Sequence, residues 1–234
     1  MKLSEITCMS FKALRRQLGL TGSHRPMVEP TADSDFCHEV IDKGWLTEEQ
    51  TAHAAMHYRL GRSKSGRTIF WMIDEWGIVR DGRIGEAWAS EMLRRRAPRL
   101  LQHFKPNHCL FGQHLLFQEP HKEICVVESE QSAVVLSELM PDQTWLAAMY
   151  PVNLNVQSFE PLQNRSVMLY PRTDPVGEYF LAWLELADQA QRIYDINVSV
   201  SPLLEDHTTP EQKEHCIDLL DFIFSTTDFT DCTD

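Results

Sequence analysis

Three carboxylates and one arginine follow two short apolar segments of the chain, where their side chains could form a metal site. Glu128 and Glu130 follow the first segment, and Arg172 and Asp174 follow the second, about forty residues later. In α/β proteins, carboxylates at the carboxyl ends of neighbouring buried strands can face each other and bind Mg²⁺. In this interpretation Glu128 and Asp174 are the metal ligands, and Glu128, Glu130 and Asp174 are the catalytic residues.

Arg172 breaks the pattern expected of such a site. Two metal-binding aspartates would be spaced Asp-x-Asp, but the chain has Arg172, Thr173 and Asp174. A guanidinium in place of a carboxylate reverses the local charge and puts a permanent cation where Mg²⁺ would lie. Arg172 could then pair with Glu128 directly, or bind a phosphate through two parallel hydrogen bonds. The remaining alternative is a weakly held Mg²⁺ that is completed by oxygens of a substrate.

Two of the carboxylates also have structural explanations. Asp174 precedes Pro175, a residue that suits the first position of a helix, so we expect Asp174 to cap the helix that follows. Glu130 lies near the start of another predicted helix, where a negative charge is favourable.

The order of these segments resembles the Toprim pattern, in which an apolar strand ends in Glu and a later one ends in Asp-x-Asp-x-x-Gly. Glu128 matches the Glu, Asp174 the second Asp and Gly177 the Gly, while Arg172 stands where the first Asp is expected. Toprim domains occur in bacterial primases, topoisomerases and some nucleases, where the acidic residues bind Mg²⁺ for phosphoryl transfer. The resemblance therefore implies a degenerate Toprim-like site with Mg²⁺ as a weak cofactor, and an enzyme of the primase or nuclease type if the site is active.

Four further segments are similar to a Toprim-like, primase-related family of bacterial mobile elements. They begin at Tyr58, Thr68, Cys109 and Val127 and end at Gly61, Asp74, Leu116 and Glu130. This resemblance implies a role in processing or binding nucleic acid, with single-stranded nucleic acid as the expected partner. The chain lacks the cysteine-rich zinc ribbon that often begins a primase, which argues against autonomous priming.

The charge of the chain is unevenly distributed. Its net charge of −12 counts against a protein that coats duplex nucleic acid, because binding phosphates requires a positive surface. Arginines are nevertheless concentrated between residues 59 and 99, and they could form a local phosphate-binding face. The nucleic-acid-binding candidates are Arg67, Arg80, Arg83, Arg94, Arg95, Arg96 and Arg172.

Two features of this charge pattern leave alternatives open. Phe70, Trp71 and Trp76 lie among the arginines, where they could stack on single-stranded bases or pack into the core. The stretch from 205 to 234 is acidic, which suits a non-enzymatic inhibitor or adaptor that docks on a basic protein partner.

Cysteine usage and hydropathy favour a cytoplasmic protein. The six cysteines include no Cys-x-x-Cys pair, which is typical of reduced thiols. No apolar run approaches the ~20 residues that a membrane-spanning helix needs, and the N-terminus lacks the apolar stretch of a secretory signal.

The elements that position these residues predict an α/β fold with three parts. We expect an N-terminal helix and linker over 1–34, an α+β region with an antiparallel β-meander over 35–118, and a Toprim-like α/β domain over 119–234. In the last part, strands 123–127 and 166–170 should be parallel neighbours in a sheet flanked by helices. A single helix should run from about 210 to 225, and Asp81 with Gly82 should form a turn.

Overall fold

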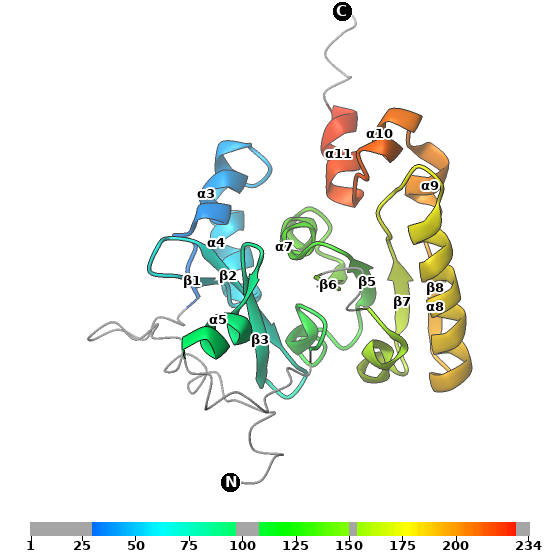
Figure 1. Cartoon of the computed structure of the whole chain (residues 1–234), viewed down its shortest axis with the longest axis horizontal. Coiled ribbons are helices and arrows are strands. Elements are labelled where there is room, and N and C mark those ends of the chain that lie inside the picture. The colour runs from blue at the N-terminus through cyan, green and yellow to red at the C-terminus, as the bar shows by residue number, and fades with distance from the viewer. Residues whose placement is uncertain (1–29, 97–107, 150–153, 228–234) are drawn as a thin grey trace, which may run out of the picture. The chain divides into compact units, whose positions relative to one another are not determined.

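The computed structural model describes residues 30–96, 108–149 and 154–227 (Figure 1). The chain divides into two compact units, Met1–Pro120 and His121–Asp234. The helix expected near the N-terminus lies outside the described residues. None of the described helices is long and apolar enough to cross a membrane.

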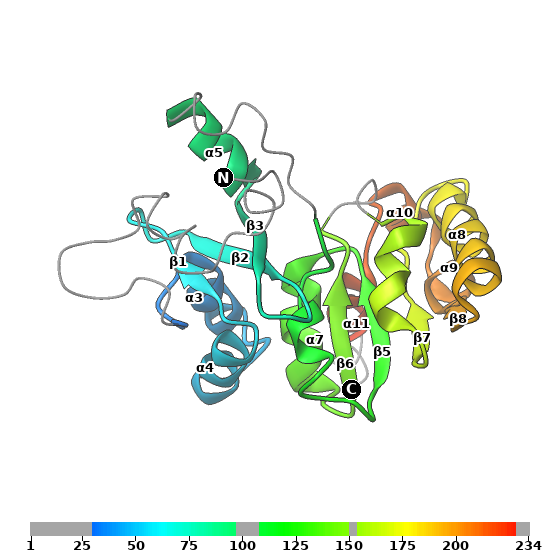
Figure 2. The same ribbon diagram turned by 90° about the horizontal axis from the view of Figure 1, so that it is seen from below.

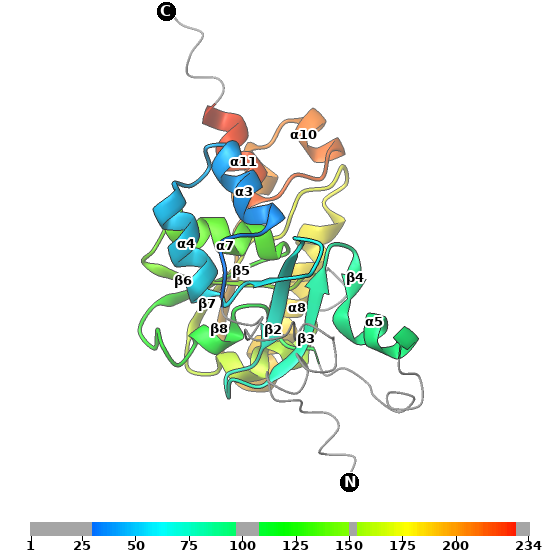
Figure 3. The ribbon, with the colours of Figure 1, turned by 90° about the vertical axis from the view of Figure 1, so that its left-hand side faces the viewer.

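The first unit contains a four-stranded antiparallel sheet with strand order β1-β2-β3-β4, and this confirms the predicted meander (Figure 3). Its described elements are, in chain order, α3 (Asp35–Asp42), α4 (Glu48–His57), β1 (Gly61–Arg62), β2 (Thr68–Ile73), β3 (Val79–Ile84), β4 (Ala87–Trp88), α5 (Ala89–Arg96) and the 3-10 helix η1 (Gln113–Leu115).

Local capping and aromatic packing explain much of this unit. Thr47 and Gln50 form the expected capping box at the start of α4, because each side chain accepts a hydrogen bond from the other residue's backbone N–H. Every residue of β2 is buried, and the Phe70 ring packs edge-on against Phe36 at 5.3 Å between centroids. Tyr58 stacks on Phe111 at 5.0 Å, which ties the end of α4 to the segment before η1.

The turn predicted at Asp81 and Gly82 is wrong, because both residues lie inside β3. Asp81 is fully buried and accepts hydrogen bonds from the backbone and hydroxyl of Ser90, at 3.0 and 2.7 Å. A Cβ atom on Gly82 would lie 2.7 Å from the Trp71 ring, so a glycine is needed where the two strands approach. Tertiary packing therefore overrides the turn preference of this dipeptide.

The second unit contains a four-stranded parallel sheet with strand order β6-β5-β7-β8 (Figure 2). Its described elements are β5 (Glu123–Val127), α7 (Glu130–Leu139), β6 (Gln143–Ala147), the 3-10 helix η3 (Val156–Leu162), β7 (Ser166–Leu169), α8 (Glu178–Tyr194), β8 (Asn197–Val200), α9 (Leu203–His207), α10 (Pro210–Glu214) and α11 (Leu219–Thr227). The α/β class and the parallel pairing of β5 with β7 are as predicted.

The strand order creates a switch point between β5 and β7. The chain leaves β5 through α7 toward β6, and it leaves β7 through α8 toward β8 on the opposite side of the sheet. Right-handed crossovers therefore place α7 and α8 on opposite faces. Ligands of open α/β sheets bind in the crevice outside the strand ends at such a switch point.

The single C-terminal helix that was predicted is two helices, α10 and α11. Cys216 between them has a positive φ of 51°, which a continuing helix cannot contain. Asp218 then starts α11, because its Oδ1 accepts hydrogen bonds from the backbone N–H groups of Leu220 and Asp221, at 2.8 and 3.0 Å.

Candidate functional site

An ion pair between Glu128 and Arg172 lies at the switch point of the parallel sheet. Glu128 follows β5 directly, and Arg172 stands three residues after the end of β7. Arg172 Nε lies 3.1 Å from Glu128 Oε2. Glu128 is only 7% exposed, whereas the Arg172 side chain is 32% exposed. Direct pairing, one of the alternatives for Arg172, is therefore what the structure contains.

Tyr179, in the first turn of α8, holds the other end of the Arg172 guanidinium. Arg172 Nη2 donates a hydrogen bond of 2.5 Å to the Tyr179 hydroxyl. The guanidinium carbon also lies 4.3 Å from the centre of the tyrosine ring, in range for a cation–π interaction. Contacts on two sides fix the direction of a planar group that stays partly open to solvent.

Burial makes the Glu128 carboxylate a stronger base than an exposed carboxylate. Removal of the carboxylate from water raises its pKa to about 7, although the charge of Arg172 acts in the opposite direction. The negative charge of Asp218 raises the pKa further. Glu128 Oε1 is buried and accepts no hydrogen bond from the described residues. Glu128 therefore titrates near neutral pH with one oxygen unsatisfied.

Asp174 is occupied as the cap of the turn that leads into α8. Its Oδ1 accepts hydrogen bonds of 3.0 Å from the N–H groups of Val176 and Glu178, and its Oδ2 accepts one of 2.8 Å from Tyr179. Burial alone would raise the pKa of Asp174, but these hydrogen bonds outweigh it and lower the pKa. Asp174 therefore caps this turn through its side chain. The predicted position of the helix start is wrong, because the N-cap of α8 is Gly177 and Pro175 lies before the helix instead of at its first position.

These contacts do not fit a Mg²⁺ ion held by Glu128 and Asp174. Mg²⁺ requires oxygens that are free to point at it in octahedral geometry. The Asp174 oxygens instead face backbone N–H groups, and the Glu128 carboxylate faces a guanidinium. Glu130 is buried at the first position of α7, where it fits the helix terminus. In the part of the chain that the structure describes, no three His, Cys, Asp or Glu side chains are grouped to hold a metal.

The segment between α10 and α11 contributes a carboxylate that sequence reasoning missed. Thr173 donates its backbone N–H and its hydroxyl to the carbonyl of Ile217, at 2.9 and 3.2 Å. Next to it, Ser132 in α7 donates its hydroxyl to Asp218, whose pKa is raised by burial. Asp218 and Asp221 form a capping box, in which the backbone N–H of each residue donates to the side chain of the other. The Asp-x-x-Asp spacing before an apolar segment could have predicted this cap.

The arginines predicted to bind nucleic acid fall into different environments. Arg80 is largely buried and binds Asp74 Oδ2 through Nε and Nη2, at 2.6 and 2.5 Å, so its charge stabilises the turn between β2 and β3. Arg67 is exposed at the start of β2. Arg83 donates its Nε–H to the Gly85 carbonyl at 2.9 Å. Arg94, Arg95 and Arg96 belong to α5, but their side chains lie outside the described residues.

The aromatic residues that were predicted to stack on bases also lie in different environments. Phe70 and Trp71 are buried in the core and are not available to stack on bases. Trp76 is 71% exposed, and its ring centre lies 5.8 Å from that of the exposed Phe117.

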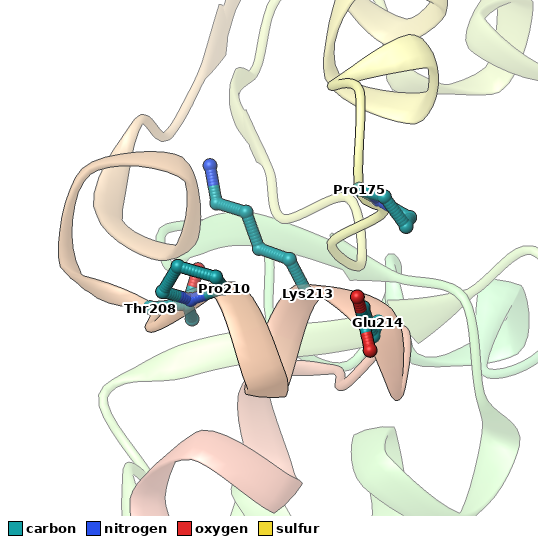
Figure 4. Close-up of a pocket in the computed structure, with 5 residues that line it drawn as sticks. All are labelled: Pro175, Thr208, Pro210, Lys213 and Glu214. Atoms are coloured by element: carbon teal, nitrogen blue, oxygen red, sulfur yellow. The ribbon is translucent and has the colours of Figure 1, made fainter.

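Neither the polar cluster around Asp81 nor the pocket beside α10 is arranged for catalysis. His108 lies 3.1 Å from Asp81, which also binds Ser90, so the carboxylate separates the two groups and the imidazole is not placed to activate the hydroxyl. A pocket of about 300 Å³ in the second unit is lined by Pro175, Thr208, Pro210, Lys213 and Glu214. Figure 4 shows these five residues. The Lys213 ammonium binds Glu205 at 2.5 Å, so its charge is already neutralised.

No curated protein matches this chain significantly. A family model described as "Domain of unknown function (DUF6371)" matches residues 35–173. The match includes the antiparallel sheet of the first unit, strands β5, β6 and β7 of the second, and both members of the Glu128–Arg172 pair. Because it covers more than half of the chain, the protein belongs to the DUF6371 family.

Proposed function

We propose that the protein binds nucleic acid and that Arg172, in place of a metal ion, receives a backbone phosphate at the carboxyl edge of the parallel sheet. The observation that carries this proposal is the Glu128–Arg172 pair at the switch point between β5 and β7. In α/β proteins this crevice is the usual ligand site. The resemblance to Toprim-like, primase-related proteins supplies the expectation of nucleic acid as the ligand.

The orientation of Arg172 supports this role. Glu128 and Tyr179 hold the guanidinium from two sides, and about a third of the side chain remains exposed. A guanidinium has more N–H donors than these two contacts use. Because its direction is fixed in advance, less side-chain entropy is lost when a phosphate binds.

The protonation of Glu128 supplies a coupling between pH and binding. Above its pKa of about 7, Glu128 neutralises Arg172 and repels an approaching phosphate. Below that pH, Glu128 becomes neutral and the full charge of Arg172 is available to the ligand. Phosphodiesters stay singly charged over this range, so affinity for an oligonucleotide should increase as the pH falls from 8 to 6.

The proposal is one of binding rather than of catalysis by a resident metal. Glu128 and Asp174, the carboxylates expected to hold Mg²⁺, are committed to Arg172 and to the backbone ahead of α8. Binding should therefore persist when divalent ions are chelated.

Fluorescence anisotropy with a labelled single-stranded oligonucleotide at low salt tests this proposal. Arg172→Ala should weaken binding by about tenfold, the loss of one well-placed, charge-assisted contact. Arg192→Ala is the matched control, since Arg192 is 74% exposed on α8 and pairs only with Asp188 among the described residues. An unchanged affinity in Arg172→Ala, with detectable binding by the natural protein, would reject Arg172 as the phosphate ligand.

An acidic surface on the C-terminal helices favours a second candidate function, docking on a basic partner protein. Asp206, Glu211, Glu214 and Asp221 are all exposed on α9, α10, α11 or the segment joining them. A chain of net charge −12 is suited to such a non-enzymatic adaptor or inhibitor. If this function holds, the protein should bind oligolysine but not the oligonucleotide, and Glu211→Gln with Glu214→Gln should weaken that binding.

A further inference from the structure

We infer a second phosphate-binding site in the first unit, at the turn between β3 and β4, where Arg67 and Arg83 converge on Gly85. Its ligand is a phosphodiester group of a nucleic-acid backbone. The inference rests on the proposed nucleic-acid function but uses residues of the other unit, so the two sites can be tested separately.

The guanidinium of Arg67 approaches Gly85 with its Nη2 end. A Cβ atom added to Gly85 would be 1.7 Å from Arg67 Nη2 and 2.6 Å from the guanidinium carbon. Gly85 also has a positive φ of 57°, a conformation that favours glycine. The guanidinium of Arg67 therefore lies against the turn between β3 and β4.

Arg67 is not neutralised by a direct ion pair within the described residues. The charge of Arg67 acts on Asp35, whose Oδ1 accepts hydrogen bonds from the N–H of Phe36 and from the N–H and hydroxyl of Thr68, at 2.7 to 2.8 Å. Burial raises the pKa of Asp35, but these hydrogen bonds and the charge of Arg67 lower it overall. Asp35 is thus used in positioning the start of β2, while the Arg67 guanidinium remains exposed.

Arg83 meets the same glycine from its carbonyl side. Its Nε–H donates to Gly85 O at 2.9 Å, and its Nη2 lies 3.6 Å from Glu86, a side chain that is 84% exposed. Two guanidinium groups thus contact Gly85, that of the exposed Arg67 and that of Arg83, whose side chain is only 17% exposed. A phosphate at this turn binds to the exposed Arg67, and the positive charge of Arg83 adds to the attraction. The exposed Glu86 can move aside at little cost.

The adjoining hairpin extends this positive surface. The turn between β1 and β2 is closed by hydrogen bonds between Ser63 and Arg67, at 2.8 and 3.0 Å, and it carries the exposed Lys64. Arg62, at the end of β1, is paired with Asp33 at 3.2 Å. Because β2 is antiparallel to both neighbours, this turn and the β3–β4 turn lie at the same end of the sheet (Figure 3). Two exposed cations at this end of the sheet, Lys64 and Arg67, suit the repeated phosphates of a strand better than one isolated anion.

The test compares full-length variants by anisotropy with a single-stranded oligonucleotide over a range of salt concentrations. Arg67→Gln should lower affinity by about threefold to tenfold and reduce the slope of log K against log salt by about one. Arg67→Lys should keep the slope while losing part of the affinity, because it retains charge without the planar fork. Lys43→Gln is the control, since Lys43 is an exposed cation of the same unit that pairs with Glu39.

The outcomes separate this site from the one at Arg172. Loss of binding in Arg67→Gln supports the inference whether or not Arg172→Ala has an effect. Unchanged affinity and slope in Arg67→Gln overturn it, even if Arg172→Ala abolishes binding. Inorganic phosphate and oligoglutamate serve as competitors at matched ionic strength. The concentration of each competitor is expressed as its concentration of negative charges. If inorganic phosphate or oligoglutamate displaces the labelled oligonucleotide as effectively as unlabelled oligonucleotide does at the same charge concentration, the ligand is not specifically a nucleic-acid backbone.

Discussion

Arg172 and Glu128 face each other at 3.1 Å across the ends of two parallel strands that are direct neighbours in the sheet. A buried carboxylate and a partly exposed guanidinium thus occupy the crevice where an α/β sheet usually holds its ligand. Tyr179 accepts a hydrogen bond from Arg172 Nη2, whereas Arg172 Nε and Glu128 Oε1 are buried and make no hydrogen bond within the described residues. The contact between Glu128 and Arg172 is therefore an ion pair and not a hydrogen bond.

Replacement of Arg172 by aspartate should create a divalent-metal site. Arg172→Asp removes the cation beside Glu128 and adds a carboxylate, and both changes favour Mg²⁺ and Mn²⁺. Calorimetry should show weak or no binding by the natural protein and affinity at least about tenfold higher in Arg172→Asp. Arg192→Asp makes the same charge change on an exposed part of α8 and should not bind metal. Tight Mg²⁺ binding by the natural protein that Glu128→Gln abolishes would contradict the account.

Stability should decrease between pH 5 and pH 8 because of Glu128. Its pKa rises from 4.5 to about 7 on folding, so the native state holds a proton that the unfolded chain has lost. The stabilisation is therefore complete below about pH 4.5 and is lost as the pH rises through 7, by up to about 3 kcal/mol.

Comparison with Glu128→Gln isolates this effect in urea titrations. Burial lowers the pKa of His114 to about 4, which makes stability rise with pH over part of the same range in both proteins. The difference in free energy of unfolding, natural protein minus Glu128→Gln, should therefore become more negative from pH 5 to pH 8. A difference that stays constant would mean that Glu128 is ionised throughout.

Loss of the Asp174 cap should destabilise the second unit. Asp174→Ala leaves three backbone N–H groups without their acceptor and should lower the free energy of unfolding by about 1–2 kcal/mol. Asp188→Ala removes an exposed carboxylate of α8 that pairs with Arg192, and it should cost no more than about 0.5 kcal/mol. Equal effects of the two substitutions in urea unfolding would show that Asp174 is not a cap.

Short-range signals in the sequence predicted the features that depend on short-range contacts. The Thr47–Gln50 capping box and the Asp174 cap each involve residues within five positions of one another. The parallel pairing of β5 with β7 could also be predicted, because a helix between parallel strands restricts the topology.

Features that depend on distant contacts were not predictable in this way. The dipeptide Asp81-Gly82 predicts a turn, but both residues lie inside a strand. Asp81 binds Ser90 and His108 there, and Gly82 packs against the Trp71 ring. Asp218 reaches α7 by bonding to Ser132, which is 86 positions away in the chain. No periodicity or motif specifies that contact, although it brings a second negative charge to bear on Glu128.

The most direct test of the central claim is the affinity of the full-length protein for a single-stranded oligonucleotide, measured with a chelator at pH 6 and pH 8. If Arg172 receives the phosphate and Glu128 controls its charge, the natural protein should bind more tightly at pH 6. Glu128→Gln should bind tightly at both pH values, and Arg172→Ala weakly at both. Binding that requires a divalent ion, or a pH dependence that survives in Glu128→Gln and Arg172→Ala, would contradict the claim.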